Sequence, residues 1–237
     1  MKRIAILSGA GMSADSGLKT FRDSGGLWEG HDVTEVASPE GFARNPSLVQ
    51  DFYNQRRRQL LQAAPNAGHR ALATLESHFE VEIITQNVDD LHERAGSSRV
   101  LHLHGELLKA RSTGPRETVY PWHRDITPED RCEEGYPLRP HIVWFGEPVP
   151  LLEAAAALTM QADVLIVVGT SLQVYPAAIL IHYRSPGSPV FLVDPNPNLR
   201  TGELPGLEIV EAKAAEGLPI LVRRLIDTAG GSARPTP

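Results

Sequence analysis

The sequence predicts an α/β fold in which helices cover both faces of a parallel sheet, and two observations support this. First, short and almost entirely apolar runs recur along the chain, as expected of strands that are buried on both faces. These runs are residues 4–7, 81–85, 100–103, 164–168 and 190–193. Second, segments of helical character lie between the runs, and strands that alternate with helices are typical of a doubly wound sheet.

Four segments carry the signals of helices. Asn45-Pro46 opens a helix that runs to about residue 64, because proline suits the first turn of a helix. Pro65-Asn66 opens the next, which runs to about residue 78. The alanine-rich stretch 151–161 and the terminal stretch 218–228 complete the predicted set.

Length, charge and cysteine content limit the classes of protein. The 237 residues suit one large domain or a core domain with a smaller insert. A net charge of −6 gives no electrostatic basis for binding nucleic acid or an anionic membrane. No apolar run approaches the roughly 18 residues that a membrane crossing needs. A single cysteine, Cys132, excludes an internal disulfide, so we expect a cytoplasmic protein.

Two stretches interrupt the alternation of strands and helices: residues 22–64 and 106–139. We expect them to form together a smaller module inserted into the core domain. The end of the chain, residues 230–237, is rich in glycine, serine and proline and is expected to be a disordered tail. The core domain then consists of residues 1–21, 65–105 and 140–229.

A glycine-rich loop, Gly9-Ala10-Gly11-Met12-Ser13-Ala14, follows the first predicted strand and matches the pattern G-x-G-x-x-G/A. Glycines in such a loop let backbone N–H groups approach a pyrophosphate, as in Rossmann-like nucleotide-binding domains. A tight strand-to-helix turn without a ligand is the alternative. Glu29 and Asp32 lie in a loop-like stretch and do not supply the acidic residue that binds a ribose after a second strand. An ordinary nicotinamide dehydrogenase is therefore disfavoured.

Five further segments occur in a fixed order: GAGMSADSGLKTFRDSGGLW, TQNVDDLHERAG, LHLHGELLK, PHIVWFGE and VVGTSLQVYPAA. With these segments the chain resembles the sirtuins, the NAD-dependent protein lysine deacylases, and the resemblance covers about residues 4–225. It is most similar to the bacterial class III members, which are like the mitochondrial desuccinylase. The resemblance implies a Rossmann-like NAD domain with a small domain made of two insertions. It also implies a reaction that consumes NAD, releases nicotinamide and moves the acyl group to ADP-ribose.

The resemblance assigns catalysis to two residues. His104, which precedes Gly105, is implied to be the general base that deprotonates a ribose hydroxyl after the acyl oxygen has attacked C1′. A histidine can accept a proton at neutral pH, which suits that role. Asn87 is implied to contact the ribose. His102, two positions from His104, is expected to be a hydrogen-bonded packing residue.

The resemblance also implies a cofactor site. Asp89 would contact the nicotinamide amide, Phe21 would cover the reacting ribose, and Arg22 would lie near the diphosphate. The remaining residues implied to bind NAD are Ala10, Gly11, Ser13, Asp15, Gln86, Gly169, Thr170, Ser171, Asn196 and Ala214. For Asp89 and Asp90, helix capping is the alternative for one of the pair.

The substrate is expected to bind at two places. The segment Val143-Trp144-Phe145 resembles the sirtuin segment to which an acylated peptide adds as a strand, and a hydrophobic core strand is the alternative. Tyr53 and Arg56 share a helix face, and in class III sirtuins such a pair lines the acyl pocket. Arginine can bind a carboxylate through two hydrogen bonds, which favours succinyl or malonyl groups. The neighbouring Arg57 and Arg58 are expected to form a solvated basic face.

The chain lacks the cysteine pairs with which most sirtuins hold a structural zinc ion. Ser112 stands about where the first cysteine is expected, and Cys132 is the only cysteine. Acidic residues and a histidine lie near Cys132, but their spacing matches no zinc site. We expect no bound zinc and a module held by packing of Tyr120, Trp122 and Tyr136.

Two other functions stay open at this point. An ADP-ribosyltransferase on the same fold would direct C1′ toward another nucleophile. A catalytically silent NAD-binding sensor would be consistent with the missing zinc cysteines, although His104, Asn87 and Asp89 are all present. The acidic composition fits a monomer and a dimer equally.

Overall fold

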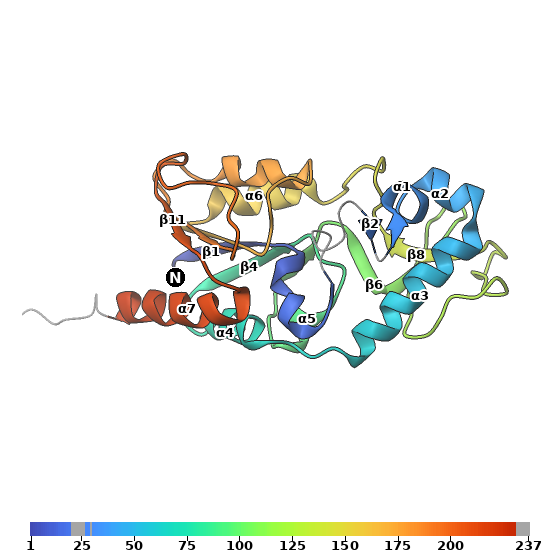
Figure 1. Ribbon diagram of the computed structural model, residues 1–237, viewed down its shortest axis with the longest axis horizontal. Coiled ribbons are helices and arrows are strands. Elements are labelled where there is room, and N and C mark those ends of the chain that lie inside the picture. The colour runs from blue at the N-terminus through green and yellow to red at the C-terminus, as the bar shows by residue number, and fades with distance from the viewer. Residues whose placement is uncertain (20–26, 29, 231–237) are drawn as a thin grey trace, which may run out of the picture.

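The computed structural model describes residues 1–19, 27–28 and 30–230, and its central feature is a sheet of six parallel strands (Figure 1). The strands lie in the order β11-β10-β9-β1-β4-β5. In chain order this is the 3-2-1-4-5-6 arrangement of the Rossmann fold, so the predicted α/β fold is confirmed. The strand bounds are Arg3–Ser8 (β1), Glu80–Thr85 (β4), Val100–His102 (β5), Val164–Val168 (β9), Val190–Val193 (β10) and Leu207–Val210 (β11).

All five predicted strands are present, and the sixth, β11, was not predicted. Its sequence, Leu-Glu-Ile-Val, includes a charged residue, and only Leu207 among its four residues is buried. β11 lies at the edge of the sheet, where it pairs with β10 alone. A strand that is only partly covered needs less apolar sequence, so its signal is weak.

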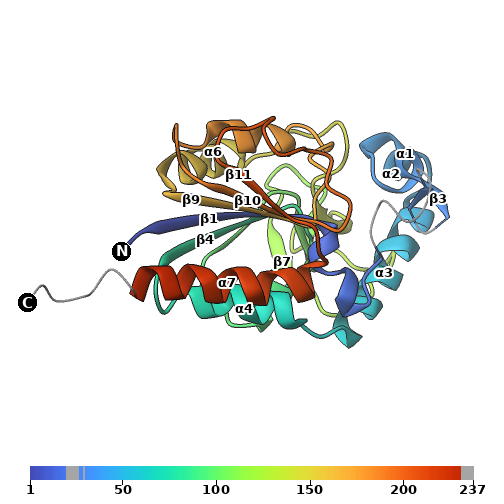
Figure 2. The same ribbon diagram turned by 60° about the vertical axis from the view of Figure 1, so that its left-hand side comes forward.

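Alternate residues of β1 face opposite sides of the sheet, and helices cover both sides. Ile4 and Ile6 belong to a core cluster with residues of α4 and α7, whereas Ala5 and Leu7 belong to a second cluster with residues of α6 and the 3₁₀ helix η4. Figures 1 and 2 show α4 and α7 side by side on one face and α6 on the other. The bounds are Ala67–Leu75 (α4), Leu152–Gln161 (α6), Ala177–Tyr183 (η4) and Ala214–Gly230 (α7).

The helix starts depend on side-chain caps. Asn45 caps α3 (Pro46–Gln62) and Asn66 caps α4, each by accepting hydrogen bonds from backbone N–H groups of the first turn, as the sequence signals predicted. The terminal helix differs from its prediction, because α7 begins at Ala214 rather than at residue 218 and continues through Pro219. Within the part of the chain that the structure describes, no helix combines the length and apolar character that crossing a membrane requires.

Beside the parallel sheet lies a smaller antiparallel sheet, in which β6 pairs with β7 on one edge and β8 on the other. Helices α1, α2 and α3 gather at the same end of the molecule (Figure 1). They share a core cluster that includes Val49, Phe52, Leu107 and Trp144. The remaining bounds are Leu27–Trp28 (β2), His31–Asp32 (β3), Val33–Val36 (α1), Pro39–Arg44 (α2), Leu91–Arg94 (α5), Gly105–Ser112 (β6), Val119–Pro121 (β7) and Leu138–Ile142 (β8), with 3₁₀ helices Ala10–Met12 (η1) and Ala14–Ser16 (η2).

Gly105 lets the chain pass from the parallel sheet into the antiparallel one. β5 ends at His102 and β6 begins at Gly105, whose φ is +82°. A side chain at Gly105 would place its Cβ atom 2.1 Å from the His141 carbonyl oxygen. Glycine is therefore required on both conformational and steric grounds. This junction fixes the position of His104 between the two sheets.

The expected solvated arginine face on α3 is wrong for Arg57 and agrees with the structure for Arg58. Arg57 is fully buried, and it donates to the Leu107 carbonyl oxygen (3.0 Å) and to Asn54 Oδ1 (2.7 Å). Burial lowers the pKa of Arg57 to about 10, so it stays charged at neutral pH. Arg58 is exposed and pairs with Asp125 (2.6 Å). Arg57 thus ties α3 to β6, a role that its neighbours in sequence do not indicate.

Candidate active site

Two glycine loops meet between β1 and β9, where the direction of winding reverses. Gly9 N donates to Val168 O (3.0 Å), and Gly11 N donates to Gly169 O (2.8 Å). A Cβ atom at Gly11 would lie 2.7 Å from the Gly169 Cα atom, and one at Gly169, whose φ is +60°, would lie 2.2 Å from Met12 N. Glycine is needed for this close approach. Ligands of open α/β sheets bind in the crevice at this position.

Side chains that follow β4 reach the first glycine loop. Asn87 Nδ2 donates to Gly9 O (3.1 Å) and to Ser13 Oγ (3.2 Å). Ser13 Oγ donates to Asp89 Oδ2 (2.9 Å), and all three side chains are buried. Burial raises the pKa of Asp89, although hydrogen bonds from Ser13 and from Leu91 N oppose the rise. The structure thus brings three of the predicted cofactor residues into one polar cluster.

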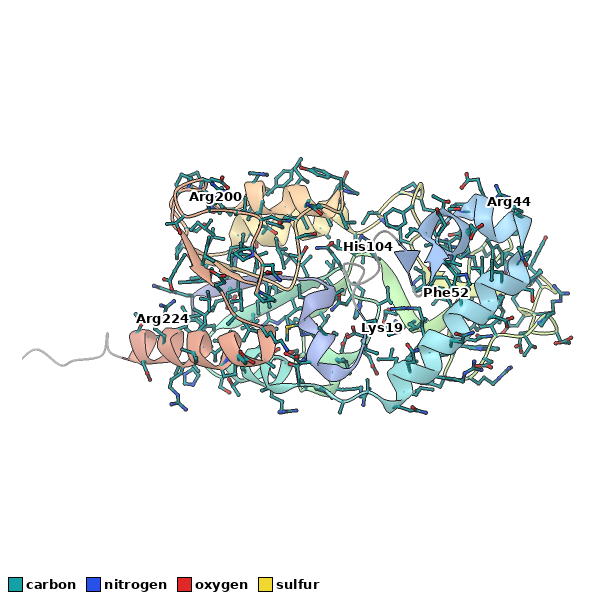
Figure 3. All side chains as sticks on the ribbon, in the orientation of Figure 1. Lys19, Arg44, Phe52, His104, Arg200 and Arg224 are labelled. Atoms are coloured by element: carbon teal, nitrogen blue, oxygen red, sulfur yellow. The ribbon has the colours of Figure 1, made fainter. Side chains whose placement is uncertain are left out.

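His104 lies between the central sheet and the small sheet (Figure 3). Its Nδ1 atom contacts the carbonyl oxygen of Gln86 (3.1 Å). A carbonyl only accepts hydrogen bonds, so Nδ1 carries the proton and Nε2 carries the lone pair. Burial lowers the pKa of His104, which keeps the ring neutral at neutral pH. A neutral imidazole with a defined Nε2 lone pair is what a general base requires.

His102 differs from His104 in that both of its ring nitrogens contact protein acceptors. Its Nδ1 atom contacts the carbonyl oxygen of Asn87 (3.2 Å), and its Nε2 atom contacts Glu93 Oε1 (2.7 Å). Burial lowers the pKa of His102, but the hydrogen bond and charge of Glu93 outweigh burial, so the net shift is upward. The prediction that His102 is hydrogen-bonded is confirmed at both ring nitrogens.

The remaining predicted NAD residues lie along the carboxyl ends of the strands. Gln86 Nε2 donates to Thr170 Oγ1 (3.2 Å), which connects the loops after β4 and β9. Asp15 pairs with Lys213 (3.3 Å), which stands next to Ala214 at the start of α7. Ala10, Ser171 and Asn196 follow their strands as predicted. Ala214 follows β11, but its side chain is buried in a core cluster. Phe21 and Arg22 lie outside the described residues.

The two residues predicted to line the acyl pocket lie on α3, beside Trp144. Trp144 Nε1 donates to Tyr53 Oη (3.0 Å), and both side chains are buried. Burial raises the pKa of Tyr53, against a smaller lowering by the nearby positive charge of Arg56. The Arg56 guanidinium lies 5.5 Å from the centre of the Phe52 ring. The charge of Arg56 thus acts on Tyr53, so the two predicted residues lie near one another.

The predicted peptide-binding segment is not a strand. β8 ends at Ile142, and the N–H groups that follow are used within the chain. Val143 N donates to His104 O (2.9 Å), Trp144 N to Glu147 Oε2 (2.7 Å) and Phe145 N to Ala37 O (2.9 Å). Trp144 is buried, whereas the Phe145 side chain is exposed. The segment is joined to the His104 backbone through Val143.

A buried network behind the glycine loop was missed from the sequence. Ser8 Oγ donates to Thr85 Oγ1 (2.8 Å) and contacts His92 Nε2 (3.0 Å), and the His92 ring centre lies 4.9 Å from that of His69. Burial lowers the pKa of His69 to about 4 and that of His92 to about 3. Both histidines stand in ordinary helical sequence, so nothing in their spacing indicates that they meet.

Comparisons with known proteins agree on one family. A profile described as the Sir2 family matches residues 9–176. An NAD-dependent protein deacylase of Helicobacter pylori (strain J99) is 54% identical over 230 residues, which cover 97% of each chain. The solved structure of a Sir2 homologue in complex with NAD is 38% identical, with a TM-score of 0.87 over 96% of this chain and 91% of that one. The structure of Sir2 bound to an acetylated peptide is 29% identical, with a TM-score of 0.76 over 96% of this chain and 93% of that one.

The buried histidine network predicts acid-sensitive stability. The unfolded chain binds protons on His69 and His92 near pH 6.5, whereas the folded chain does so only nearer pH 4 and pH 3. The free energy of unfolding should therefore fall as the pH falls below about 6.5. Urea denaturation from about pH 7 to about pH 5 measures it. His92→Gln, which keeps a donor toward Ser8, should reduce the slope, and the exposed control His182→Gln should not. Equal slopes in all three proteins would contradict this assignment.

Proposed function

The chain belongs to the Sir2 family and is an NAD-dependent protein deacylase, and we propose that it removes succinyl and malonyl groups as well as acetyl groups from lysine. The observation that supports the chemistry most directly is the geometry of His104. Its Nδ1 atom is held by the Gln86 carbonyl oxygen, which leaves the Nε2 lone pair to accept a proton. We propose that the protein is a sirtuin of the bacterial class III type.

We propose that NAD binds over the two glycine loops. The close approach of Gly11 to Gly169 fits a bound dinucleotide, because it lies at the switch point of the sheet, where open α/β sheets bind their ligands. Asn87 would hold the ribose, and Asp89 the nicotinamide amide. A Sir2 homologue with a TM-score of 0.87 is known in complex with NAD, which supports this placement. The proposed adenosine contacts are Gly169, Thr170, Ser171, Asn196 and Ala214; those along the diphosphate and nicotinamide half are Ala10, Gly11, Ser13, Asp15, Phe21, Arg22 and Gln86.

The proposed mechanism divides the work among these residues. Bound NAD supplies an electrophilic C1′ atom and nicotinamide as the leaving group, and the oxygen of the acylated lysine attacks C1′. His104 Nε2 then removes the proton of a ribose hydroxyl, which attacks the former acyl carbon. Asn87 orients the ribose for both steps. With water, the products are free lysine and O-acyl-ADP-ribose.

We propose that the acylated peptide lies along Val143-Trp144-Phe145. The three N–H groups of this segment already donate within the chain, so added-strand pairing would use its carbonyl oxygens. The exposed Phe145 side chain would cover the peptide, and the buried Trp144 would hold Tyr53 in place. The structure of Sir2 bound to an acetylated peptide supports a partner of this kind.

We propose a division of the chain into a core domain of residues 1–21, 65–105 and 140–229 and a small module of residues 22–64 and 106–139. β8 crosses the second boundary and pairs with β6, so we extend the module to Ile142. Gly230 ends α7, and the rest of the expected tail lies outside the described residues.

The residues of the module do not fit a structural zinc ion. Among the described residues, no group of three or more histidine, cysteine, aspartate or glutamate side chains is arranged to hold a metal. Ser112 Oγ accepts from Gly114 N (3.0 Å), and Cys132 lies in a small core cluster with Ile126 and Leu138. We propose that this packing, with Tyr120 and Trp122 against it, takes the place of a zinc site.

Mass spectrometry of one peptide carrying acetyl-, succinyl- or malonyl-lysine tests the proposed function. We expect NAD-dependent loss of each acyl group with formation of O-acyl-ADP-ribose. His104→Ala should abolish turnover, because removing a general base typically costs about 10²- to 10⁴-fold. Transfer of ADP-ribose to protein, or NAD binding without nicotinamide release, would contradict the deacylase assignment for these acyl groups.

The Arg56 guanidinium should determine acyl preference. Arg56→Met should lower kcat/KM for succinyl-lysine by about 10²-fold or more, because a carboxylate loses a charged partner, and should change deacetylation far less. Arg58→Met is the matched control, since Arg58 is exposed on the same helix. An equal loss for both acyl groups would refute a carboxylate clamp.

The module should be stable without metal. Purified protein should contain much less than one zinc per chain by elemental analysis, and a chelator should leave the thermal midpoint of unfolding unchanged. Cys132→Ala should lower stability modestly, by about 1 kcal/mol, as expected for removing one small buried group. One zinc per chain, lost together with stability on chelation, would overturn this proposal.

A further inference from the structure

Two histidines hold two successive carbonyl groups of the turn that carries Asn87. His104 Nδ1 contacts the Gln86 carbonyl oxygen (3.1 Å), and His102 Nδ1 contacts the Asn87 carbonyl oxygen (3.2 Å). Asn87 N donates to Thr85 Oγ1 (3.0 Å), so the backbone of Asn87 is bound on both sides. The turn between β4 and α5 is therefore fixed by residues at the β5–β6 junction.

The contacts of His102 define its protonation state. The Asn87 carbonyl and the Glu93 carboxylate both only accept hydrogen bonds, so both ring nitrogens must donate. The ring is then an imidazolium, with Glu93 as its counter-ion at 2.7 Å. The side chain of His102 is 8% exposed and that of Glu93 is 40% exposed, so water reaches the pair from the Glu93 side only.

Several charged or titratable groups surround His102. Glu93 on α5 and Glu106 on β6 raise its pKa, whereas burial lowers it. Asp89, before α5, and His92, on α5, also interact with the His102 charge: burial raises the pKa of Asp89 against this interaction, whereas burial and this interaction both lower the pKa of His92. The carboxylates outweigh the rest, and the pKa of Glu93 is correspondingly lowered, its hydrogen bond and charge interaction with His102 outweighing the effect of burial.

We propose that His102 is a positioning residue: as an imidazolium bound to Glu93, it donates to the Asn87 carbonyl and fixes the turn that orients Asn87 and the His104 base. This rests on the proposed function, because Asn87 and His104 act on NAD only in a deacylase of this type. The His102 ring is bonded to protein at both nitrogens and is assigned no contact with substrate. Its effect on the reaction passes through the backbone of Asn87.

Loss of the His102 proton would break one of its two hydrogen bonds. If the neutral ring keeps its proton on Nδ1, the Nε2 lone pair faces the Glu93 carboxylate and the hydrogen bond to Glu93 is lost. If it keeps its proton on Nε2, the hydrogen bond to the Asn87 carbonyl is lost. The proton is bound below the raised pKa of His102 and is lost as the pH rises through it. His104 must be neutral to act, so His104 limits activity at acid pH and His102 limits it at alkaline pH.

Two substitutions of His102 separate its two hydrogen bonds. His102→Asn places an amide NH₂ near the position of Nδ1 and can still donate to the Asn87 carbonyl. His102→Gln places it near the position of Nε2 and keeps only the bond to Glu93. On succinyl- and acetyl-peptides we expect His102→Asn to keep kcat within about twofold, and His102→Gln to lose about 10- to 100-fold in kcat with a smaller change in the KM for NAD.

Glu93→Gln gives a second test through the pH profile. The side-chain amide that this substitution introduces can donate to a neutral His102 Nε2, which leaves the Nδ1 proton on the Asn87 carbonyl. We expect the alkaline limb of kcat in the wild-type protein to be lost in Glu93→Gln, while the acid limb stays. A merely structural role for the pair would change stability and leave the shape of the profile unchanged.

Amide hydrogen exchange over residues 86–91 separates this proposal from the proposed function. Faster exchange in His102→Gln than in His102→Asn supports positioning even if no peptide is deacylated, in which case only the proposed function fails. Wild-type deacylation, with His104→Ala inactive, establishes the function independently. Equal losses in the two His102 variants, together with a Glu93→Gln profile like that of the wild type, would overturn the positioning role.

Discussion

The contact between the loop after β1 and the loop after β9 is the constraint on which the site depends. Gly11 and Gly169 approach so closely that a Cβ atom on either would meet backbone. This contact places Ser13 within reach of Asn87 and Asp89 from the next strand. The polar cluster is therefore a consequence of backbone packing at the switch point of the sheet, and its hydrogen bonds then hold the loop against the neighbouring strand.

The junction between β5 and β6 connects this cluster to the small module. Gly105 turns the chain where no other residue fits, and the turn leaves His104 with its carbonyl bound to Val143 and its ring bound to Gln86. Residues His104 and Gly105 thus connect the proposed general base both to the proposed peptide-binding segment and to the turn that carries Asn87. Because one rigid backbone serves all three, displacement of the module relative to the sheet would change the geometry of the base.

The sequence predicted the parts of the molecule whose signals are local. Buried strands of a parallel sheet are continuous apolar runs, and the glycine loop after the first strand has a fixed spacing, so β1, β9 and the loop after β1 could be located from the chain alone. The burial of Arg57 could not be predicted, because it depends on the Leu107 carbonyl, which lies 50 residues away on β6. The weak edge strand β11 and the early start of α7 before Pro219 were missed for lack of a local signal. The family resemblance indicated His104, and the structure adds which of its nitrogens carries the proton.

Two histidines separated by one residue differ in charge because their partners differ in kind. Burial favours the neutral ring of His104 and outweighs the opposing effect of the Gln86 carbonyl, whereas a carboxylate at 2.7 Å acts on His102 and favours the cation. The two residues are of one type and stand two positions apart, so nothing in Leu-His-Leu-His-Gly shows which ring carries a charge. The distinction comes from Glu93 on α5, a helix that begins only after the Asn87 turn. The Asn87 turn is thus bound by the His102 cation. The counter-ion of that cation, Glu93, lies on α5, the helix that follows the turn. Since the Asn87 turn, α5 and β5 each position a member of this arrangement, the two hydrogen bonds of the His102 cation can form together only when all three are in place.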